Sequence, residues 1–154
     1  MRRVVILGRG GAGKSVAAVR LGRVTGLPVV ELDRLFWRPD LTPTPAPVWL
    51  ERQREIAAAD RWIIDGDLGP YDTAGIRLSR ADTVLVLDFA LPRCAWRAAR
   101  RSRERAHFWW WLLTWRRRAR PVVLDAIAAH AAHADVHILR RPRQLDRLLA
   151  GLRR

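Results

Sequence analysis

The residues best suited to chemistry lie in one glycine-rich stretch of the form G-x-x-x-x-G-K-S, which contains Gly8, Gly10, Gly11, Ala12, Gly13, Lys14, Ser15 and Val16. Glycine allows consecutive backbone N–H groups to curve around phosphate oxygens without steric conflict from Cβ atoms. Lys14 can reach the outer phosphates of a nucleotide, and the hydroxyl of Ser15 can bind Mg²⁺. Of the 29 basic residues only Lys14 is a lysine, and a compact ammonium suits a phosphate cradle better than a planar guanidinium. We therefore predict a loop that binds a nucleoside triphosphate together with Mg²⁺.

A strand before this loop and a helix after it must hold it in place. The apolar residues 3–7 predict the strand, and a helix is expected to follow the loop and to end at residues 25–28. Further apolar runs predict four more strands, at residues 29–32, 62–65, 83–89 and 136–139. These runs are nearly continuous in Val, Ile and Leu, as in strands buried on both faces. Helical or loop segments separate them, which predicts an α/β fold with a five-stranded parallel sheet and helices on both faces.

Polar residues follow several of these strands, at the edge where a parallel sheet binds its ligands. Asp65 is placed to hold Mg²⁺ through water, or else to cap the turn that follows it. Asp33, Arg34 and Asp67 are expected to bind the acceptor of a transferred group, and Asp33 could serve as its general base. The alternative for Asp33 is a surface ion pair with Arg34 or Arg38. The sheet edge that carries the loop is therefore the predicted site.

The composition limits the class of protein. The chain has 154 residues and 49% apolar content, which suits a single domain spanning residues 1–154. Its one cysteine excludes an internal disulfide and fits a reducing compartment, and no segment is long enough to span a bilayer, so we expect a cytoplasmic protein. The net charge of +14 is concentrated in residues 91–154, which hold 16 arginines and four acidic residues. This asymmetry indicates an anionic partner: a nucleotide, a nucleic acid or a membrane surface.

Residues 108–115 are almost entirely aromatic or aliphatic. At helical spacing one face collects Phe108, Trp111, Leu112 and Trp115, which indicates packing against the sheet or against a second copy of the chain in a homodimer. Two alternatives stay open for this segment. It could lie on a membrane surface, or its tryptophans could stack on the bases of a single-stranded nucleic acid. The four histidines suggest no metal site, because no cysteine or third ligand accompanies them.

Motifs at or near the predicted strands accompany the loop, at residues 32–37 (LDRLFW), 62–67 (WIIDGD), 81–89 (ADTVLVLDF) and 139–143 (LRRPR). A separate arginine run stands at residues 116–121 (RRRARP). With these motifs the chain resembles the nucleoside-monophosphate-kinase branch of the P-loop proteins. It is most similar to the adenylate-kinase-like family that is named for DNA topology modulation. The resemblance covers most of the chain in register.

The resemblance implies a sheet with the strand order 2-3-1-4-5, numbered along the chain, in a kinase that uses ATP and Mg²⁺. It implies that Arg97 and Arg101, on a helix that begins at Pro92, stabilise the transferring phosphoryl group. Arg140 would then contact the adenine base of the nucleotide. Kinases of this branch usually carry a longer mobile lid, whereas residues 104–115 leave room only for a reduced one.

The sequence thus predicts a phosphotransferase that moves the γ-phosphate of ATP to a small acceptor, either a nucleoside monophosphate or another small metabolite. The acceptor stays open because adenylate kinases carry an arginine soon after the Asp–Gly pair, where this chain has Asp67, Pro70 and Asp72. The alternative from another class is a nucleotide-dependent protein that binds DNA or RNA through the arginine-rich residues 91–154.

Overall fold

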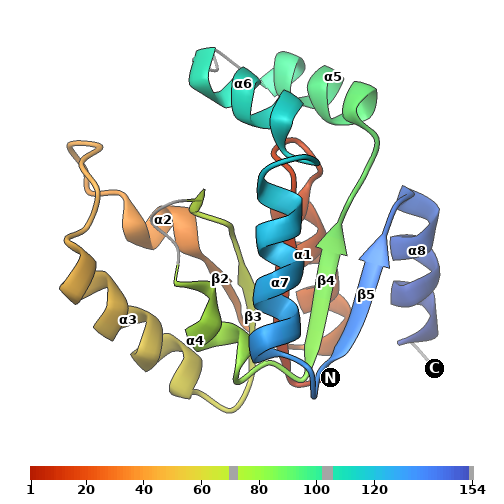
Figure 1. Ribbon diagram of the computed structural model, residues 1–154. Helices are drawn as coiled ribbons and strands as arrows, with labels where there is room; N and C mark the ends of the chain where they lie inside the picture. The colour runs from red at the N-terminus through yellow and green to blue at the C-terminus, as the bar shows by residue number, and fades with distance from the viewer. Residues whose placement is uncertain (70–72, 102–105, 153–154) are drawn as a thin grey trace.

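The sheet contains five parallel strands in the order β2-β3-β1-β4-β5, which confirms the predicted topology. The structure is a computed structural model that describes residues 1–69, 73–101 and 106–152. The strands are β1 (Arg3–Gly8), β2 (Val29–Glu31), β3 (Trp62–Asp65), β4 (Thr83–Leu87) and β5 (Asp135–Leu139). β1 is central, so the loop that follows it leaves the middle of the sheet edge (Figure 1).

Two strands end earlier than the sequence predicts. The second was expected to reach residue 32, but Leu32 is buried as the first residue of a short helix. The fourth was expected to reach residue 89, but the chain turns at Asp88, whose N–H donates to the carbonyl oxygens of Val86 and Leu139. Apolar residues continue past both strand ends because they are buried next to the sheet. An apolar run does not distinguish a residue buried within a strand from one buried just beyond it.

Eight helices connect and cover the strands within the described residues: α1 (Lys14–Thr25), α2 (Leu32–Phe36), α3 (Ala46–Ala58), α4 (Ala74–Leu78), α5 (Leu91–Arg101), α6 (Ala106–Thr114), α7 (Ala119–His130) and α8 (Pro142–Gly151). α1 begins directly in the glycine-rich loop and ends at Gly26, whose left-handed conformation (φ 69°) lets its N–H donate to the Gly22 carbonyl oxygen at 2.8 Å. None of the described helices is both long enough and apolar enough to cross a membrane.

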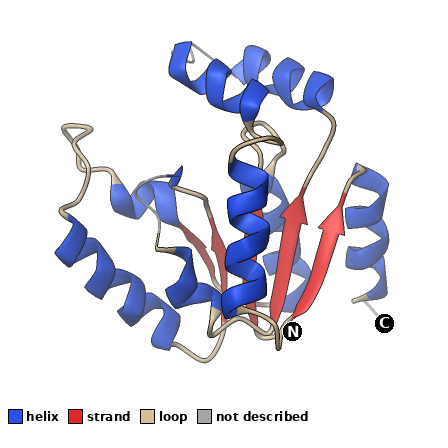
Figure 2. Cartoon of the chain, in the orientation of Figure 1, coloured by secondary structure: helices blue, strands red, loops and turns tan. Residues whose placement is uncertain are grey.

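Alternate residues of the buried strands pack into two cores, one on each face of the sheet. Figure 2 shows helices on both faces. Val4 and Ile6 of β1 face α1 and α8, whereas Val5 and Leu7 face α2, α3, α4 and α7. Burial on both faces is the reason for the continuous apolar runs of the strands. In Figure 1, α7 crosses in front of the sheet and α1 lies behind it.

α5 and α6 lie beyond the carboxyl ends of the strands, next to the glycine-rich loop (Figure 1). Cys94 of α5 and Leu112 of α6 are both fully buried, in the same core as α1. This pair of helices therefore covers the edge of the sheet at which the predicted site residues meet.

Candidate nucleotide and acceptor site

The glycine-rich loop has the backbone that the sequence predicts. Gly11 takes a positive φ of 72°, and a Cβ atom added there would lie 2.3 Å from the carbonyl oxygen of Cys94 in α5. Only glycine satisfies both the conformation and this close approach. The Lys14 ammonium donates a hydrogen bond to the Gly8 carbonyl oxygen at 3.0 Å, so the cation lies inside the curve of the loop. The loop can accommodate phosphate oxygens through its backbone N–H groups and this ammonium.

Asp65 ends β3 beside the loop and is 4% exposed. It accepts a hydrogen bond from the Ser15 side chain, and its Oδ1 atom has no hydrogen-bond partner among the described residues. Burial raises the pKa of the Asp65 carboxyl; Lys14 and Ser15 oppose this effect, and the nearby Asp33 and Glu31 carboxylates add to it. Asp65 is thus a buried acid whose negative charge needs a further cation or donor.

These residues fit Mg²⁺. Mg²⁺ is usually held by one or two protein oxygens together with phosphates and water, and not by a protein-only cage. The described residues contain no group of three or more His, Cys, Asp or Glu side chains that could hold a metal alone. The Ser15 hydroxyl and the unpartnered Oδ1 atom of Asp65 provide the two oxygens that such a shared site requires.

Glu31 is a site residue that the sequence reasoning missed. It is the last residue of β2 and lies in register with Asp65 on the neighbouring strand. Its carboxylate pairs with Arg34 at 3.1 Å, so Arg34, which was expected to bind the acceptor, has an acidic partner other than Asp33. The pairing register of β2 with β3 places Glu31 at the site. The sequence signal that could have identified Glu31 is an acidic residue at the end of an apolar run.

Asp33 and Asp67 lie at the same edge of the sheet. Asp33 is in the first turn of α2 and is close enough to Asp65 to raise its pKa. Asp67 accepts the Gly69 N–H at Oδ1 (3.0 Å), while its Oδ2 atom is buried without a hydrogen-bond partner among the described residues. A buried carboxylate oxygen without a donor is costly, so a hydroxyl or cation of a ligand would satisfy it.

Arg77 is the second residue that the sequence reasoning missed. Its guanidinium is buried and donates to the Gly66 carbonyl oxygen and to the Gln53 side chain, both at 3.2 Å. The segment after Asp65 lacks a nearby arginine in sequence, and α4 supplies one from 11 residues beyond Gly66. No local pattern marks this residue, because the contact depends on how α4 packs on β3.

The α5 helix brings Arg97 to the loop. A Cβ atom added at Gly13 would lie 3.1 Å from Arg97 Nη2, so the guanidinium rests against the start of α1. This is where a cation would meet the outer phosphates of a nucleotide in the loop. The other arginine predicted on this helix, Arg101, has its side chain outside the described residues.

The tryptophan-rich segment, residues 108–115, packs against the glycine-rich loop. A Cβ atom added at Gly10 would lie 2.7 Å from a ring atom of Trp111 and 2.8 Å from one of Phe108. Leu112 and Trp115 are fully buried within the chain. The apolar face predicted for this segment therefore packs within its own chain. α6 occupies part of the predicted reduced lid, residues 104–115, of which residues 104 and 105 lie outside the described residues.

A cluster of arginines surrounds Asp88 on the opposite side of β1 from Asp65. The Asp88 carboxylate is buried and pairs with Arg116 Nε at 3.2 Å and with Arg120 Nε at 3.0 Å. Asp88 thereby anchors the start of α7 to the end of β4. Arg140 follows β5 and is exposed; its N–H donates to the Gln144 side chain at 2.7 Å, and its contact with a base remains a prediction.

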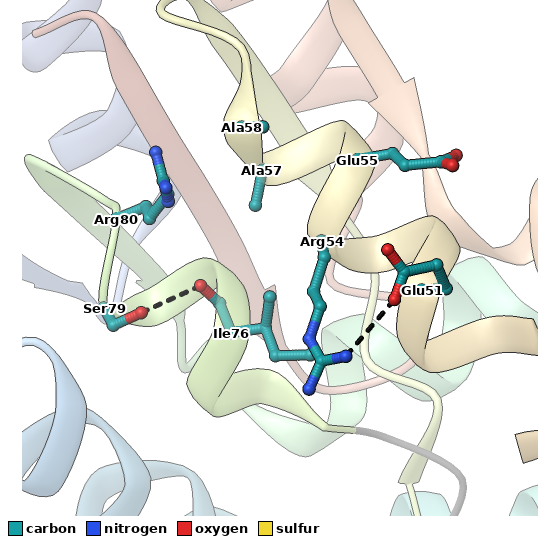
Figure 3. Close-up of a pocket in the computed structure, with 8 residues that line it drawn as sticks. All are labelled: Glu51, Arg54, Glu55, Ala57, Ala58, Ile76, Ser79 and Arg80. Carbon is teal, nitrogen blue, oxygen red and sulfur yellow. Dashed lines mark hydrogen bonds and ion pairs between the residues drawn. The ribbon is translucent and has the colours of Figure 1, made fainter. Parts of the chain in front are cut away.

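A surface groove of about 520 Å³ lies away from the loop, between α3 and α4 (Figure 3). Its lining includes the ion pair between Glu51 and Arg54, with 3.2 Å between Oε2 and Nη1. None of the predicted site residues lines this groove. The predicted site therefore lies at the sheet edge and not in this groove.

Comparisons with known proteins identify a family and a fold for this chain. The model of the isopentenyl transferase family matches residues 1–80, which include the loop and the residues at the ends of β2 and β3. No curated protein matches the chain in sequence.

Solved structures match nearly the whole chain. A shikimate kinase from Acinetobacter baumannii, in complex with shikimate, matches with a TM-score of 0.66 and 14% identity over 99% of this chain and 90% of its own. An unliganded sugar kinase from Janibacter matches with a TM-score of 0.56 and 21% identity, over 99% and 94% of the two chains. A deoxyadenosine kinase from M. mycoides with bound dATP matches with a TM-score of 0.56 and 13% identity, over 98% of each chain. These neighbours are P-loop kinases, and the shared fold is adenylate-kinase-like.

Proposed function

This chain belongs to the isopentenyl transferase family, and we propose that it uses the shared phosphate loop as a kinase, moving the γ-phosphate of ATP to a small acceptor. The observation that carries the proposal is the convergence on one sheet edge of the loop lysine, the buried Asp65 and the Arg97 guanidinium. Phosphoryl transfer depends mainly on positioning and charge neutralisation, which such a set supplies. The likeness of the whole fold to kinases of small molecules also supports it.

The residues divide into a nucleotide side and an acceptor side. Backbone N–H groups of the loop and Lys14 hold the phosphates, and Arg97 stabilises the charge of the transferring group. Ser15, and Asp65 through water, would hold Mg²⁺, which would supply charge neutralisation at the outer phosphates. An acceptor hydroxyl lies near Asp33, which takes its proton as the hydroxyl oxygen bonds to the γ-phosphorus and the bond to ADP breaks.

The acceptor class is the finer part of the proposal. Asp33 and Asp67 favour an acceptor that presents hydroxyl groups, because carboxylates accept hydrogen bonds from hydroxyls. Three kinases of similar fold are named for small hydroxylated molecules. They are a sugar kinase, a shikimate kinase and a deoxyadenosine kinase. We expect the acceptor of this chain to be a polyhydroxylated metabolite or a nucleoside derivative. The narrower resemblance to the DNA topology modulation family stays a prediction.

The test is acceptor-stimulated release of ADP from Mg·ATP, measured with a panel of sugars, hydroxy acids, nucleosides and nucleoside monophosphates. One class of acceptor should stimulate release, and Lys14→Ala should abolish it. Arg97→Gln should lower kcat by about 100-fold or more while the Kd for ADP changes little. Arg93→Gln changes an exposed arginine one helical turn before Arg97; it is the matched control and should retain activity. Absence of stimulation by every acceptor class would exclude a kinase.

The family name provides the competing reaction, in which an isopentenyl group and not a phosphoryl group is transferred. A donor that carries a diphosphate would place it in the same loop, so binding alone does not distinguish the two reactions. Mass spectrometry of the products does. A kinase converts ATP to ADP and adds phosphate to the acceptor, whereas an isopentenyl transferase releases diphosphate from its donor and adds a five-carbon group.

Two exposed tryptophans favour a second candidate function, binding of single-stranded nucleic acid. Trp96 is 60% exposed with the Arg100 guanidinium 4.6 Å from its ring centroid, and Trp110 is 52% exposed with Arg118 at 4.7 Å. Aromatic rings beside arginines can stack on bases while the arginines contact phosphates. Binding of an oligonucleotide should quench tryptophan fluorescence and should weaken steeply between about 50 and 200 mM salt. Absent or salt-independent binding would exclude this candidate.

A further inference from the structure

α6 is apolar on its outer side as well as on the side that packs against the loop. The inner side includes Leu112, which is fully buried, and Trp111, which lies against Gly10. On the outer side, Trp110 is 52% exposed and Leu113 is 60% exposed. Residues three apart in a helix are neighbours on one face, so these two side chains form a single apolar patch. Helices that are apolar all round are normally covered all round, and the described residues leave this patch uncovered.

Arginines border the apolar patch. The Arg118 guanidinium lies over the Trp110 ring, 4.7 Å from its centroid. Arg117 is exposed in the turn that follows α6, where its N–H donates to the Thr114 carbonyl oxygen at 2.9 Å. Residues 106–124 contain four arginines and no acidic residue. The charge beside the patch is therefore positive, and no carboxylate of the same segment balances it.

We propose that Trp110, Leu113, Arg117 and Arg118, which together we call the α6 face, dock onto the surface of a membrane that contains anionic lipids. Tryptophan is favoured at the boundary between lipid headgroups and acyl chains, and leucine gains free energy by leaving water. The guanidinium groups pair with lipid phosphates and respond to the negative surface charge. α5 and α6 are the outermost elements at the end of the molecule that carries the loop, so a surface as extended as a membrane can reach them (Figure 1). Docking goes beyond the proposed function because it needs neither nucleotide nor turnover.

Charge and side-chain type favour a lipid surface over two other partners. In a symmetric dimer the same patch faces itself, so Arg117 and Arg118 of two copies would repel one another with no acidic residue of the segment between them. Nucleic acid is anionic, but base stacking uses Trp110 and leaves Leu113 without a role, because an aliphatic side chain has no aromatic face. An anionic bilayer accommodates the apolar and the basic side chains together.

Cosedimentation of the full chain with vesicles tests the docking. Vesicles of phosphatidylcholine and phosphatidylserine should bind the protein at about 0.1 M salt. Vesicles of phosphatidylcholine alone should bind it more than about tenfold more weakly, and this difference should shrink as the salt concentration approaches about 1 M. Absent binding to the anionic vesicles, or equal binding to both kinds, would overturn the inference.

Substitutions locate the docking on α6. Leu113→Gln and Trp110→Ala should each weaken binding to the anionic vesicles about tenfold, because each removes apolar area that leaves water. Arg117→Gln should weaken it about fivefold. The matched controls lie on other elements: Leu41→Gln, at a leucine that is 74% exposed between α2 and α3, and Arg52→Gln, at an exposed arginine of α3. Both controls should bind as the wild type does, whereas wild-type affinity in Leu113→Gln would contradict the role of the α6 face.

Quenching of tryptophan fluorescence reports on the contact itself. Lipids with brominated acyl chains should quench the wild-type protein, and Trp110→Phe should remove part of this quenching while most of the affinity is kept. Identical quenching in both proteins would mean that another face docks, which overturns the inference. It is overturned as well by a dimer that Leu113→Gln dissociates in sedimentation equilibrium, or by a single-stranded oligonucleotide that binds the α6 face when the vesicles do not.

Discussion

The Lys14 ammonium lies 3.0 Å from the carbonyl oxygen of Gly8 and donates a hydrogen bond to it, which connects the last part of the loop to its first residue. The lysine is thereby held inside the loop before any ligand arrives. Preorganised donors cost no reorganisation when charge develops during the reaction, so the position of this one atom matters more than the presence of a positive charge.

This relationship predicts that arginine cannot replace Lys14. A planar guanidinium is larger than an ammonium and cannot both donate to Gly8 and point at phosphates from the same place. We expect Lys14→Arg to lower kcat by about 100-fold or more. The reverse exchange at the surface, Arg118→Lys, is the control and should change kcat less than twofold. Comparable activity of Lys14→Arg and wild type would contradict the role assigned to this lysine.

The contact of α6 with the loop predicts the effect of a single methyl group. Gly10 does not have a positive φ, but an added Cβ would lie 2.7–2.9 Å from the rings of Trp111 and Phe108. We expect Gly10→Ala to lower the free energy of unfolding by about 1–3 kcal/mol, because the rings must shift. Chemical denaturation measures this loss.

Two companion variants test the cause. Phe108→Leu replaces one of the rings with a smaller side chain and should recover part of the loss in the double variant, with a coupling of about 1 kcal/mol. Gly151→Ala places a methyl group in α8 where nothing lies within 4 Å, and it should leave stability unchanged or slightly higher. Equal effects of Gly10→Ala with and without Phe108 would show that α6 does not rest on the loop.

The raised pKa of Asp65 predicts how Mg²⁺ binding depends on pH. Burial favours the protonated acid, so Asp65 takes up its proton at a higher pH than an ordinary aspartate, whose pKa is about 3.9. The protonated form is a poor partner for a metal-bound water. As pH falls through this raised pKa, the gain in ATP affinity that Mg²⁺ provides should shrink.

Titration calorimetry with ATP, with and without Mg²⁺, between about pH 5 and 8 measures this dependence. Asp65→Asn cannot titrate at this position, so its Mg²⁺ gain should be small and should show only the pH dependence that ATP itself has, because the terminal phosphate takes up a proton near pH 6. A Mg²⁺ gain in the wild type that stays constant to the lowest pH, or an unchanged gain in Asp65→Asn, would contradict the assignment of Asp65 to the metal.

Asp82 provides a prediction about stability alone. Its Oδ2 atom accepts the backbone N–H groups of Arg2 at 2.7 Å and Arg3 at 3.0 Å, which fastens the start of β1 beside β4. Burial would raise the pKa of Asp82, but the hydrogen bonds from Thr83, Arg3 and Arg2 together lower it. We expect Asp82→Asn to lower the free energy of unfolding by about 1–3 kcal/mol at neutral pH.

The pH dependence follows from the sign of that pKa shift. A carboxylate with a lowered pKa in the folded state stabilises the fold above its unfolded pKa, near 3.9, and loses this contribution as pH falls through the folded value. The difference in stability between wild type and Asp82→Asn should therefore begin to shrink as pH falls below about 4, and it should disappear only below the lowered pKa of the folded state. A difference that persists in acid would mean that the hydrogen bonds do not need the charge.

The sequence by itself determined the sheet, the loop and most of the edge that carries the chemistry. Strands buried on both faces must be continuously apolar, so their positions and parallel arrangement can be read from local composition. The loop is local too, since strand, glycines, Lys14 and helix are consecutive. Asp33, Asp65 and Asp67 follow the same logic, because residues after parallel strands meet at one edge.

Only the tertiary structure decided which residues support and cover that edge. Arg77 enters the site through the packing of α4, which leaves no local signal. Glu31 enters it through register with β3, which the acidic residue at the end of an apolar run does not by itself reveal. In the sequence, Arg9 is one of the variable positions of the loop motif. Folding buries it against Trp115, which is more than 100 residues away in the sequence. Periodicity reports which face of a segment is buried but not what covers it, so the contact of α6 with Gly10 and the arginine cluster at Asp88 follow only from how distant segments pack together.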